Sequence, residues 1–411
     1  MTLTKEQYNC KVYILNRIRN NPYPFFNPQY TPFITLVAGY AGTGKTFLIS
    51  KIRKELYSIN PKTNVAFVTF TGKASSVLRN TLNENGALFG MDHIGTIHSL
   101  IYKPIFKYNK DLKKQVIVGW GKREHDEINV DIIFIDEASM ISKNLWDDLK
   151  SYNRTIIAFG DNGQLPPIED SFSLLKYPNF KLTDIQRQIE TSPIIKLAHH
   201  VRTGGSIPVN KMYSKEVFKL SWPDPRCRKI FDSIEFDENI ILLCGFNYSR
   251  VVLNKMIRDK LGYTNLEPYP SERVICLKNN HKIKLMNGQI GTVHWLMPEF
   301  KNGFRITIDV DGEMYECLTS DSQFGKVNYD MYEKSPGKKR LYNEAMKIGY
   351  DVDYFDYANA ISVHKSQGSE WDRVVLFEQR SQYWNNQMYA KWLYTALTRA
   401  KKKLFIISDF Y

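Results

Sequence analysis

The segment Phe33-Ile-Thr-Leu-Val-Ala-Gly-Tyr-Ala-Gly-Thr-Gly-Lys-Thr46 decides the fold. Its first part, Phe33 to Ala38, is an apolar run of strand length, and its second part, Gly39 to Thr46, has the pattern G-x-x-x-x-G-K-[ST]. The next residues, Phe47 to Ile52, begin an amphipathic helix. A glycine-rich loop between a buried strand and a helix is the context of a phosphate-binding loop. The segment therefore predicts an α/β domain that binds a nucleoside triphosphate.

The residues of this loop have separate expected tasks. Its glycines let backbone N–H groups close around phosphate oxygens, and the helix start adds positive potential. We expect the Lys45 ammonium to reach the β- and γ-phosphates of ATP and the Thr46 hydroxyl to ligate Mg²⁺. The alternative is a glycine turn that binds nothing. The residues expected to surround ATP here are Gly39, Ala41, Gly42, Thr43, Gly44, Lys45 and Thr46.

A pair of acidic residues, Asp136 and Glu137, follows the apolar run Ile132 to Ile135. In open α/β sheets, side chains at the carboxyl ends of buried strands lie near bound ligands. We expect Asp136 to hold Mg²⁺ through its water shell and Glu137 to orient and deprotonate the attacking water. Gln164 follows another apolar run, Ile156 to Gly160, and is a candidate sensor of the γ-phosphate. A solvated acidic turn is the alternative interpretation of the pair.

Phosphoryl transfer also needs cations near the developing negative charge. Arg187 and Arg399 lie in the part of the chain that we assign to a second domain. Each is a candidate arginine finger. The alternative for each is an ordinary surface charge.

The length of 411 residues predicts two principal domains, because single cores stop growing well below that size. Short apolar runs alternate with amphipathic stretches, which is typical of parallel sheets flanked by helices. Two insertions interrupt this pattern. One is a hairpin around a lysine-rich turn, and the other is a β-rich segment that we interpret as a small barrel. The sequence of the barrel's tail, residues 329–350, does not indicate a particular secondary structure. The expected division is 1–100 and 129–177 for the first domain, 101–128 for the hairpin, 178–270 and 352–411 for the second domain, and 271–351 for the β-rich insertion.

Composition favours a polyanionic partner inside the cell. The formal net charge is +13, and Lys or Arg side chains that neutralise phosphates release counterions, so nucleic acid is the expected partner. A basic surface that only keeps the protein in solution is the alternative. The five cysteines are scattered, which suggests neither a zinc ribbon nor a disulfide framework and indicates a reducing compartment. Without a signal peptide or a long apolar run, we expect a cytoplasmic protein, in a bacterium or a phage-infected host, with no membrane partner.

In their order, the motifs resemble those of superfamily 1 helicases, in the branch that contains RecD and the phage helicase Dda. Thr71 to Ser76 is similar to motif Ia, Gly95 to Ser99 to motif Ib, and Val363 to Trp371 to motif V. The His-Lys-Ser-Gln-Gly form of motif V and the Gln-Leu-Pro-Pro form of motif III at 164–167 separate this branch from the UvrD-like one. The resemblance spans nearly the whole chain. It implies two RecA-like P-loop domains, with a strand-separating pin in the first and an SH3-like β-barrel in the second.

The resemblance also implies roles for individual residues at the nucleotide. ATP would bind in the cleft between the two domains, with Gln7 at the adenine edge and Gly368 and Glu370 facing the nucleotide. Arg187 and Arg399 would complete hydrolysis. Closing and opening of the cleft would then drive 5′→3′ movement along a strand.

A further set of residues is implied to touch the nucleic acid. Hydroxyls, amides and imidazoles donate to phosphate oxygens without reading the base sequence, so no sequence specificity is expected. The alternative for His98 and His364 is that they are packing residues. The alternative for the hairpin aromatics, Tyr108 among them, is that they cover the core of the domain. The strand contacts are Lys73, Thr96, His98, Asn247, His364 and Ser366, and the candidate wedge residues are Phe106, Tyr108 and Trp120.

The implied activity is that of an ATP-dependent DNA helicase that uses Mg²⁺. Its partners would be single-stranded DNA, forks between single- and double-stranded DNA, and single-strand-binding or replisome proteins, and it would act as a monomer. One alternative is a helicase for RNA or RNA–DNA duplexes, because backbone contacts do not announce the sugar. Another is a nucleotide-gated nucleic-acid-binding subunit of a larger replication or recombination complex.

Overall fold

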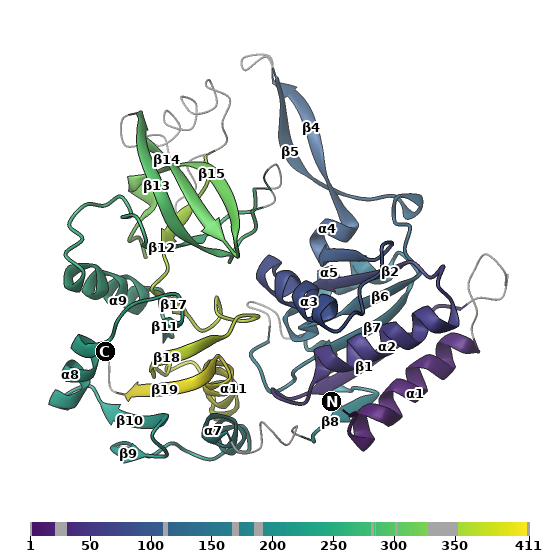
Figure 1. Cartoon of the computed structure of the whole chain (residues 1–411), viewed down its shortest axis with the longest axis horizontal. Coiled ribbons are helices and arrows are strands. Elements are labelled where there is room, and N and C mark those ends of the chain that lie inside the picture. Colours follow the sequence, from purple (N-terminus) through teal and green to yellow (C-terminus); the bar gives the residue numbers. More distant parts are fainter. Residues whose placement is uncertain are drawn as a thin grey trace. The chain divides into compact units, whose positions relative to one another are not determined.

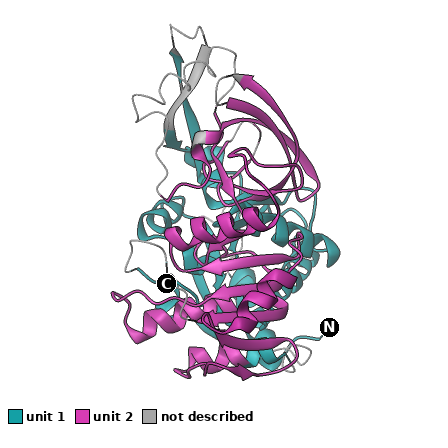
Figure 2. Ribbon diagram, turned by 90° about the vertical axis from the view of Figure 1, so that its left-hand side faces the viewer, with its two compact units in different colours: residues 1–109, 114–196 teal, residues 110–113, 197–411 magenta. Residues whose placement is uncertain are grey.

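The computed structural model describes residues 2–20, 31–109, 114–166, 172–184, 192–280, 283, 285–300, 303–327 and 352–408. The chain divides into two compact units, shown in different colours in Figure 2. Unit 1 comprises residues 1–109 and 114–196, and unit 2 comprises residues 197–411 together with residues 110–113, which lie outside the described ranges.

Unit 1 is built on a six-stranded parallel sheet with the strand order β3-β2-β6-β7-β1-β8 (Figure 1). The strands are β1 (Ile34–Gly39), β2 (Val65–Thr69), β3 (His93–Thr96), β6 (Ile132–Ile135), β7 (Thr155–Gly160) and β8 (Phe180–Leu182). The helices are α1 (Lys5–Arg19), α2 (Lys45–Ile59), α3 (Gly72–Glu84), α4 (Ile97–Ile101) and α5 (Lys143–Lys150), with short 3₁₀ turns η1 (His125–Glu127), η2 (Ala138–Met140) and η3 (Leu174–Lys176). The predicted parallel α/β domain is confirmed.

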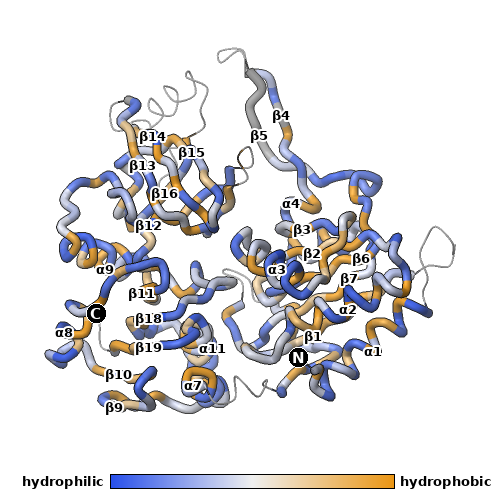
Figure 3. The backbone as a smooth tube through the Cα atoms, in the orientation of Figure 1, coloured by the Kyte–Doolittle hydropathy of each residue, from blue (hydrophilic) through white to orange (hydrophobic). Residues whose placement is uncertain are grey.

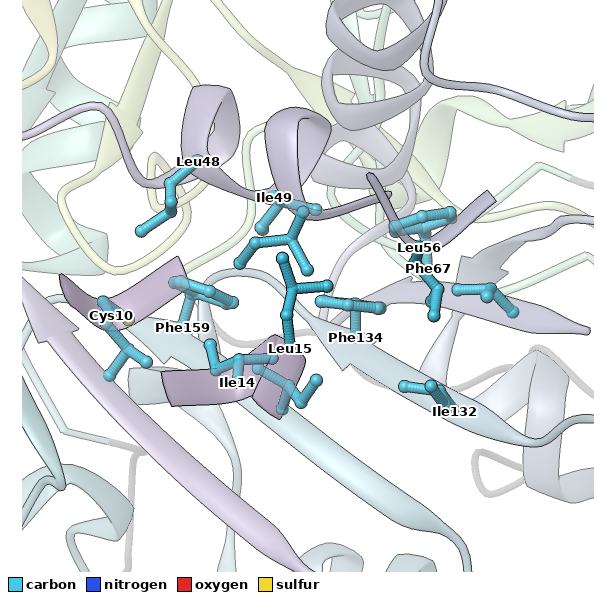
Figure 4. Close-up of a cluster of buried hydrophobic side chains, with 14 of the residues drawn as sticks. Cys10, Ile14, Leu15, Leu48, Ile49, Leu56, Phe67, Ile132, Phe134 and Phe159 are labelled. Atoms are coloured by element: carbon cyan, nitrogen blue, oxygen red, sulfur yellow. The ribbon is translucent and has the colours of Figure 1, made fainter. Parts of the chain in front are cut away.

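Helices cover both faces of this sheet, because successive strand residues point to opposite sides. On one face, Phe67 and Phe134 pack with residues of α1, α2 and α3, including Leu15 and Ile49 (Figure 4). On the other face, residues of α4 and α5 pack against the alternate strand positions, such as Val68 and its neighbours on β6 and β7. Buried strands of this kind read as continuous apolar runs, as the orange strands of Figure 3 show.

A β-hairpin leaves unit 1 directly after α4. Its strands β4 (Tyr102–Asn109) and β5 (Lys114–Lys122) pair with each other in a separate two-stranded antiparallel sheet. A hairpin therefore lies within the predicted range 101–128, and its strands span 102–122; its role as a pin stays a prediction. Its turn, residues 110–113, lies outside the described residues.

Unit 2 contains a second α/β sheet with the order β17-β11-β18-β19-β10-β9, in which every pair is parallel except β10 with β9. Its core lies between β11, β18 and β19 on one side and helices α8 and α9 on the other. The strands are β9 (Lys211–Met212), β10 (Val217–Ser221), β11 (Ile240–Cys244), β17 (Ala360–Ser362), β18 (Trp371–Phe377) and β19 (Ala400–Ser408), and the helices are α7 (Pro193–Arg202), α8 (Pro225–Ser233), α9 (Asn247–Lys260) and α11 (Asn386–Leu397). Helix α7 begins at Pro193, just before the boundary at residue 197.

A five-stranded antiparallel sheet, with the order β15-β14-β13-β12-β16, interrupts this second sheet in sequence. Its two edges approach each other, because the Asp353 amide donates to the Leu318 carbonyl at 2.7 Å. The elements are β12 (Arg273–Cys276), β13 (Ile290–Phe300), β14 (Gly303–Val310), β15 (Glu313–Ser320) and β16 (Phe355–Tyr357), with the 3₁₀ turn η4 (Asp321–Gln323). The β-rich insertion is thus present, and residues 329–350 lie outside the described ranges.

Two expected boundaries differ from the structure. The first domain does not end at 177, because β8 pairs in parallel with β1 through Phe180 to Leu182, and unit 1 continues to residue 196. The β-rich insertion does not end at 351, because β16 pairs with β12. Among the described residues, no helix has the length and apolar character that crossing a membrane requires.

Candidate functional site

The glycine-rich loop links β1 to α2 and is held in shape by its own backbone. Gly42 and Gly44 have φ angles of 82° and 70°, which side chains rarely allow. The Thr43 hydroxyl donates to the Tyr40 carbonyl at 2.8 Å. The Lys45 ammonium donates to the Gly39 carbonyl at 2.9 Å, so its charge is folded over the loop. The loop is therefore preformed, with backbone N–H groups and one cation at the start of a helix.

The acidic pair lies where the sequence predicted, directly after β6. The Thr46 hydroxyl donates to Asp136 Oδ2 at 2.8 Å, and Asp136 is 7% exposed. Glu137 has the left-handed backbone angles φ 55° and ψ 39°, which are unusual for a residue with a side chain. Local strain of this kind clusters at functional sites. The structure thus joins the loop after β1 to the acids after β6.

Gln164 lies in the turn after β7, the strand between β6 and β1 in the sheet. It is 4% exposed, and within the described residues its Oε1 atom has no hydrogen-bond partner. The Ser139 hydroxyl, two residues after Glu137, is also buried without a partner in the described ranges. Buried polar atoms without partners indicate a missing ligand or water. The sequence analysis did not single out Ser139, although its place beside the acidic pair was a usable signal.

Gln7 contacts the glycine-rich loop in a way that the sequence did not predict. Its Nε2 atom donates to the Thr43 carbonyl at 2.7 Å, and its Oε1 atom accepts from the Thr4 amide at 2.9 Å. The residue is 1% exposed. Each end of the amide therefore makes one hydrogen bond, and in this conformation Gln7 anchors the loop to α1. Its contact with an adenine edge stays a prediction. The neighbouring Glu6 carboxylate accepts from the Thr183 amide and hydroxyl, at 2.5 and 2.7 Å.

The Thr46 and Asp136 oxygens fit a Mg²⁺ ion. Both are hard oxygen donors, and one carboxylate with waters and phosphate oxygens is the usual environment of this ion. Within the described residues no group of three or more His, Cys, Asp or Glu side chains is placed to hold a metal ion.

Arg399 and the segment 368–370 come together in unit 2. The Arg399 guanidinium donates to the Ser369 carbonyl at 3.0 Å and to the Thr398 hydroxyl at 3.1 Å, and the residue is 3% exposed. Gly368 has φ 75°, and Glu370 is exposed and lies 3.7 Å from the Lys401 ammonium. As the structure stands, Arg399 stabilises this loop instead of projecting into solvent.

Arg187 lies outside the described residues. Its expected place in the second domain rested on a boundary at 177, whereas unit 1 continues to residue 196 and so includes position 187.

Three candidate strand contacts of unit 1 are close in space. Lys73 is half-buried in the first turn of α3, Thr96 caps α4 through the Ser99 amide, and His98 follows in α4. The Ser75 hydroxyl donates to the Gly95 carbonyl at 2.7 Å and ties the two segments together. His98 is exposed, the Tyr102 ring lies 5.7 Å from its ring, and burial lowers the pKa of His98, which favours the neutral imidazole.

The candidate strand contacts of unit 2 follow neighbouring strands. Asn247 is exposed at the start of α9, after β11, and His364 is half-buried after β17, where burial lowers its pKa. Ser366 is completely buried, and its hydroxyl donates to the Val363 carbonyl at 2.8 Å. In this conformation Ser366 shapes the loop and has no surface that a strand can touch, contrary to the expectation of a direct contact.

The hairpin presents apolar side chains to solvent. Ile105, Tyr108 and Trp120 are 47%, 59% and 43% exposed. Because they are exposed, these side chains do not cover the domain core, and the alternative interpretation of Tyr108 and Trp120 as core-covering residues is wrong. Phe106 lies within β4, paired in register with Ile117, but its side chain is outside the described part of the structure.

An exposed aromatic group in unit 2 was missed by the sequence analysis. Phe246, Tyr248 and Tyr383 are 37%, 65% and 87% exposed. The loops that carry them are joined because Gln379 accepts from the Gly245 amide at 2.9 Å and donates to the Ser249 hydroxyl at 2.7 Å. Such rings stack on bases of any sequence. The flanking of Asn247 by two aromatics was the available signal.

Two family models match parts of the chain. An AAA domain matches residues 27–170, and a UvrD-like helicase C-terminal domain matches residues 357–407. These ranges contain the glycine-rich loop and the acidic pair in unit 1, and motif V and Arg399 in unit 2.

Curated relatives and solved structures extend the similarity to most of the chain. The ATP-dependent RecD2 DNA helicase of Deinococcus radiodurans is 25% identical, over 90% of this chain and 46% of its own length. The ATP-dependent DNA helicase Dda of Enterobacteria phage T4 is 23% identical, over 90% of this chain and 93% of its own. A crystal structure of the Pif1 helicase from Bacteroides, in complex with ADP-AlF3 and single-stranded DNA, has a TM-score of 0.56 at 19% identity and covers 100% of this chain and 92% of that one.

The chain thus spans less than half the length of the Deinococcus relative and nearly all of the phage one. The low identity to the Pif1 structure limits that comparison to the fold.

Proposed function

We propose that this chain, which belongs to the RecD/Dda-like branch of the superfamily 1 helicases, is an ATP-dependent DNA helicase that moves 5′→3′ on single-stranded DNA and separates duplex DNA. The observation that carries the proposal is the pairing of the Thr46 hydroxyl with Asp136 at 2.8 Å, beneath a preformed glycine-rich loop. That pairing supports the proposal, because it joins the phosphate loop to the acidic pair.

The residues of unit 1 have distinct parts in hydrolysis. Lys45 leaves the Gly39 carbonyl to contact the β- and γ-phosphates, which gain negative charge in the transition state. Thr46 and Asp136 would hold Mg²⁺, which would neutralise phosphate charge when bound. Glu137 accepts a proton from the attacking water, and Gln164 orients that water through its buried Oε1 atom. Arg187 and Arg399 supply further cations, and Arg399 releases the Ser369 carbonyl to do so.

Single-stranded DNA is held through its backbone and stacked bases. Lys73, Thr96 and His98 in unit 1 and Asn247 and His364 in unit 2 contact phosphates and sugars. The exposed rings of Phe246, Tyr248 and Tyr383 stack on bases, which does not depend on sequence.

The two insertions complete the helicase. The hairpin acts as the pin, with Trp120, Tyr108 and Phe106 as its wedge residues, and the antiparallel sheet of unit 2 is an SH3-like barrel. The protein works as a monomer in the cytoplasm, and single-strand-binding or replisome proteins are its partners.

The proposal is tested by ATP hydrolysis with and without single strands, and by unwinding of duplexes that carry a 5′ or a 3′ overhang, in DNA and RNA versions. We expect stimulation by single-stranded DNA and unwinding from 5′ DNA overhangs. Lys45→Ala abolishes both activities, because the phosphates lose their cation. Lys54→Ala, on the exposed side of the same helix, is the control that keeps them.

Each other outcome has a definite meaning. Unwinding from 3′ overhangs alone refutes the polarity. Unwinding of RNA duplexes in preference to DNA favours the RNA alternative. Hydrolysis that single strands do not stimulate favours a nucleotide-gated binding subunit.

A further inference from the structure

The hairpin has an unusually well-defined base. β4 begins at Tyr102 with no linker after α4, and β5 ends at Lys122. The Arg123 amide donates to the Ile101 carbonyl at 2.9 Å, so the chain enters and leaves the hairpin at adjacent points. Beyond this base, the two strands have only each other as sheet partners within the described residues.

Two residues at the end of α5 contact both sides of that base. The Tyr152 hydroxyl lies 2.9 Å from the Ile101 carbonyl and 2.8 Å from the Arg123 carbonyl, and its single proton is donated to one of them at a time. Asp148 accepts from the Tyr102 hydroxyl at 2.5 Å and from the Lys122 ammonium at 3.0 Å. We call Asp148 and Tyr152 the hairpin clamp.

The chemistry of the clamp favours a stiff connection. The hydrogen bond from the Tyr102 hydroxyl lowers the pKa of Asp148, so the carboxylate is ionised at pH 7. Burial and the same carboxylate raise the pKa of Tyr102, which therefore stays a donor. Hydrogen bonds to an ionised group are shorter and stronger than neutral ones. Tyr152 is 1% exposed, so its hydroxyl has no water to replace the two carbonyls.

The base also adjoins residues with proposed roles in the motor. α4 carries His98, whose ring lies 5.7 Å from the Tyr102 ring. α5 begins six residues after Glu137. A two-stranded hairpin alone is only marginally stable in water. A hairpin that splits a duplex must resist the force at the fork, and the contacts at its base supply resistance that its own two strands do not.

We infer that Asp148 and Tyr152 are positioning residues for strand separation, which hold the hairpin fixed to unit 1 so that movement along one strand forces the other aside. The inference rests on the proposed helicase function. In this inference, both the base of the hairpin and its exposed aromatics couple ATP hydrolysis with unwinding.

The first experiment compares Tyr152→Phe and Asp148→Ala with the wild type. Phenylalanine keeps the ring and removes only the hydroxyl. We expect the number of base pairs opened per ATP hydrolysed, on a fork with a 5′ overhang, to fall about fivefold, because one lost hydrogen bond shifts the equilibrium between a fixed and a loose hairpin by about that factor. Hydrolysis stimulated by single-stranded DNA stays within about twofold of the wild type, since the nucleotide and strand contacts are intact.

Asp147→Ala is the matched control. Asp147 is the neighbour of Asp148 on α5, but its carboxylate only forms exposed ion pairs with Lys143 and Lys150. We expect this variant to behave as the wild type. An equal loss of hydrolysis and unwinding in Tyr152→Phe would indicate general damage to unit 1 and overturn the inference.

A second readout does not depend on helicase activity. The five native cysteines are all buried, so a probe attached to Lys107→Cys, on the exposed part of β4, labels the hairpin selectively. The spectrum of a spin label at this position should show greater mobility after Tyr152→Phe or Asp148→Ala. After Asp147→Ala its mobility should equal that of the wild type. Unchanged mobility would overturn the inference even where unwinding falls. A wild-type protein that does not unwind would instead refute the proposed function, while the mobility comparison would still decide on the clamp.

Discussion

Gly160, the last residue of β7, shows how closely the nucleotide site is packed. A Cβ atom at this position would lie 2.8 Å from the Ser139 amide nitrogen and 3.0 Å from that of Ala138. Both are backbone atoms of η2, the turn after the acidic pair, and they cannot move aside independently. The absence of a side chain at Gly160 therefore sets the approach of the two turns that carry Glu137 and Gln164.

We predict that Gly160→Ala destabilises unit 1 by roughly 1 to 3 kcal/mol, the usual cost of overpacking, and lowers the rate of hydrolysis more than it lowers ATP affinity. Thermal unfolding and steady-state kinetics measure the two effects. Gly90→Ala is the control, because nothing lies within 4 Å of a Cβ there. Equal behaviour of the two variants would contradict the prediction.

His93 makes the stability of unit 1 depend on pH. Burial, followed by the charges of Arg123 and Arg79, lowers its pKa. The unfolded chain then binds a proton more readily than the folded one. The contribution of His93 is therefore complete above the ordinary imidazole pKa, about 6.5, and is lost as the pH falls below it.

We predict that the melting temperature falls between about pH 7.5 and about pH 5.5, and that His93→Gln makes this decline shallower. The histidines at 98, 199 and 364 have lowered pKa values too and remain in the variant, so part of the slope persists. Calorimetry across this range gives the slope. A variant as steep as the wild type would be inconsistent with the role of His93.

Gln7 shows what the sequence can give at the scale of one residue. Resemblance identified it as a residue of the nucleotide site, and it does touch the glycine-rich loop. Its partner there, the Thr43 carbonyl, is a backbone atom 36 residues away, and no pattern of side chains announces such a contact. The positions of Lys45, Thr46 and Asp136 were predictable because these residues come shortly after apolar runs that form strands.

At the scale of elements, helix α9 joins the parallel sheet of unit 2 to the antiparallel one. Arg258 of α9 forms a buried ion pair with Glu272, just before β12, and its guanidinium lies 4.0 Å from the Tyr357 ring of β16. Arg250, two turns earlier, pairs in the same way with Asp356. The antiparallel sheet is thereby fixed to the helix that begins at Asn247.

We predict that Glu272→Ala destabilises unit 2 by about 3 kcal/mol or more, because it leaves the buried Arg258 without its carboxylate. Asp259→Ala removes the exposed partner of Lys255 on the same helix and should change stability little. Urea unfolding followed by tryptophan fluorescence compares them. A small effect of Glu272→Ala would show that Arg258 is satisfied by its backbone acceptors alone.

Long elements were predictable and short ones were not. The apolar runs at 65–70, 132–136 and 156–160 became β2, β6 and β7 within one or two residues. β8 and β16 have three residues each, too few to show a period, and they exist because a distant strand offers an unpaired edge. Both misplaced domain boundaries follow from these two strands.

At the scale of the whole molecule, the charge of +13 should control binding. Each phosphate that the protein neutralises releases counterions from the strand. We predict that the Kd for a short single-stranded DNA rises at least about tenfold between about 50 mM and about 200 mM salt, as for a few phosphate contacts. Fluorescence anisotropy titrations measure it. A Kd that is insensitive to salt would mean that stacking alone holds the strand.

The general architecture was accessible from the sequence, since two α/β patterns and two insertions are each marked by periodicity and turns. The state of Arg399 was not. The sequence places it at a helix end, but only the fold shows its guanidinium buried against the loop at 368–370. Which acceptors surround a long side chain depends on contacts between remote segments.

The Ile101 carbonyl and the Arg123 amide nitrogen are 2.9 Å apart, so the hairpin enters and leaves the domain at adjacent points, as an insertion that could be exchanged does. The strands between these two points pair only with each other within the described part of the chain, and at their base Tyr102 and Lys122 contact Asp148. Hairpins of other length or chemistry can therefore be grafted between Tyr102 and Lys122, with these two residues kept, without redesigning the domain.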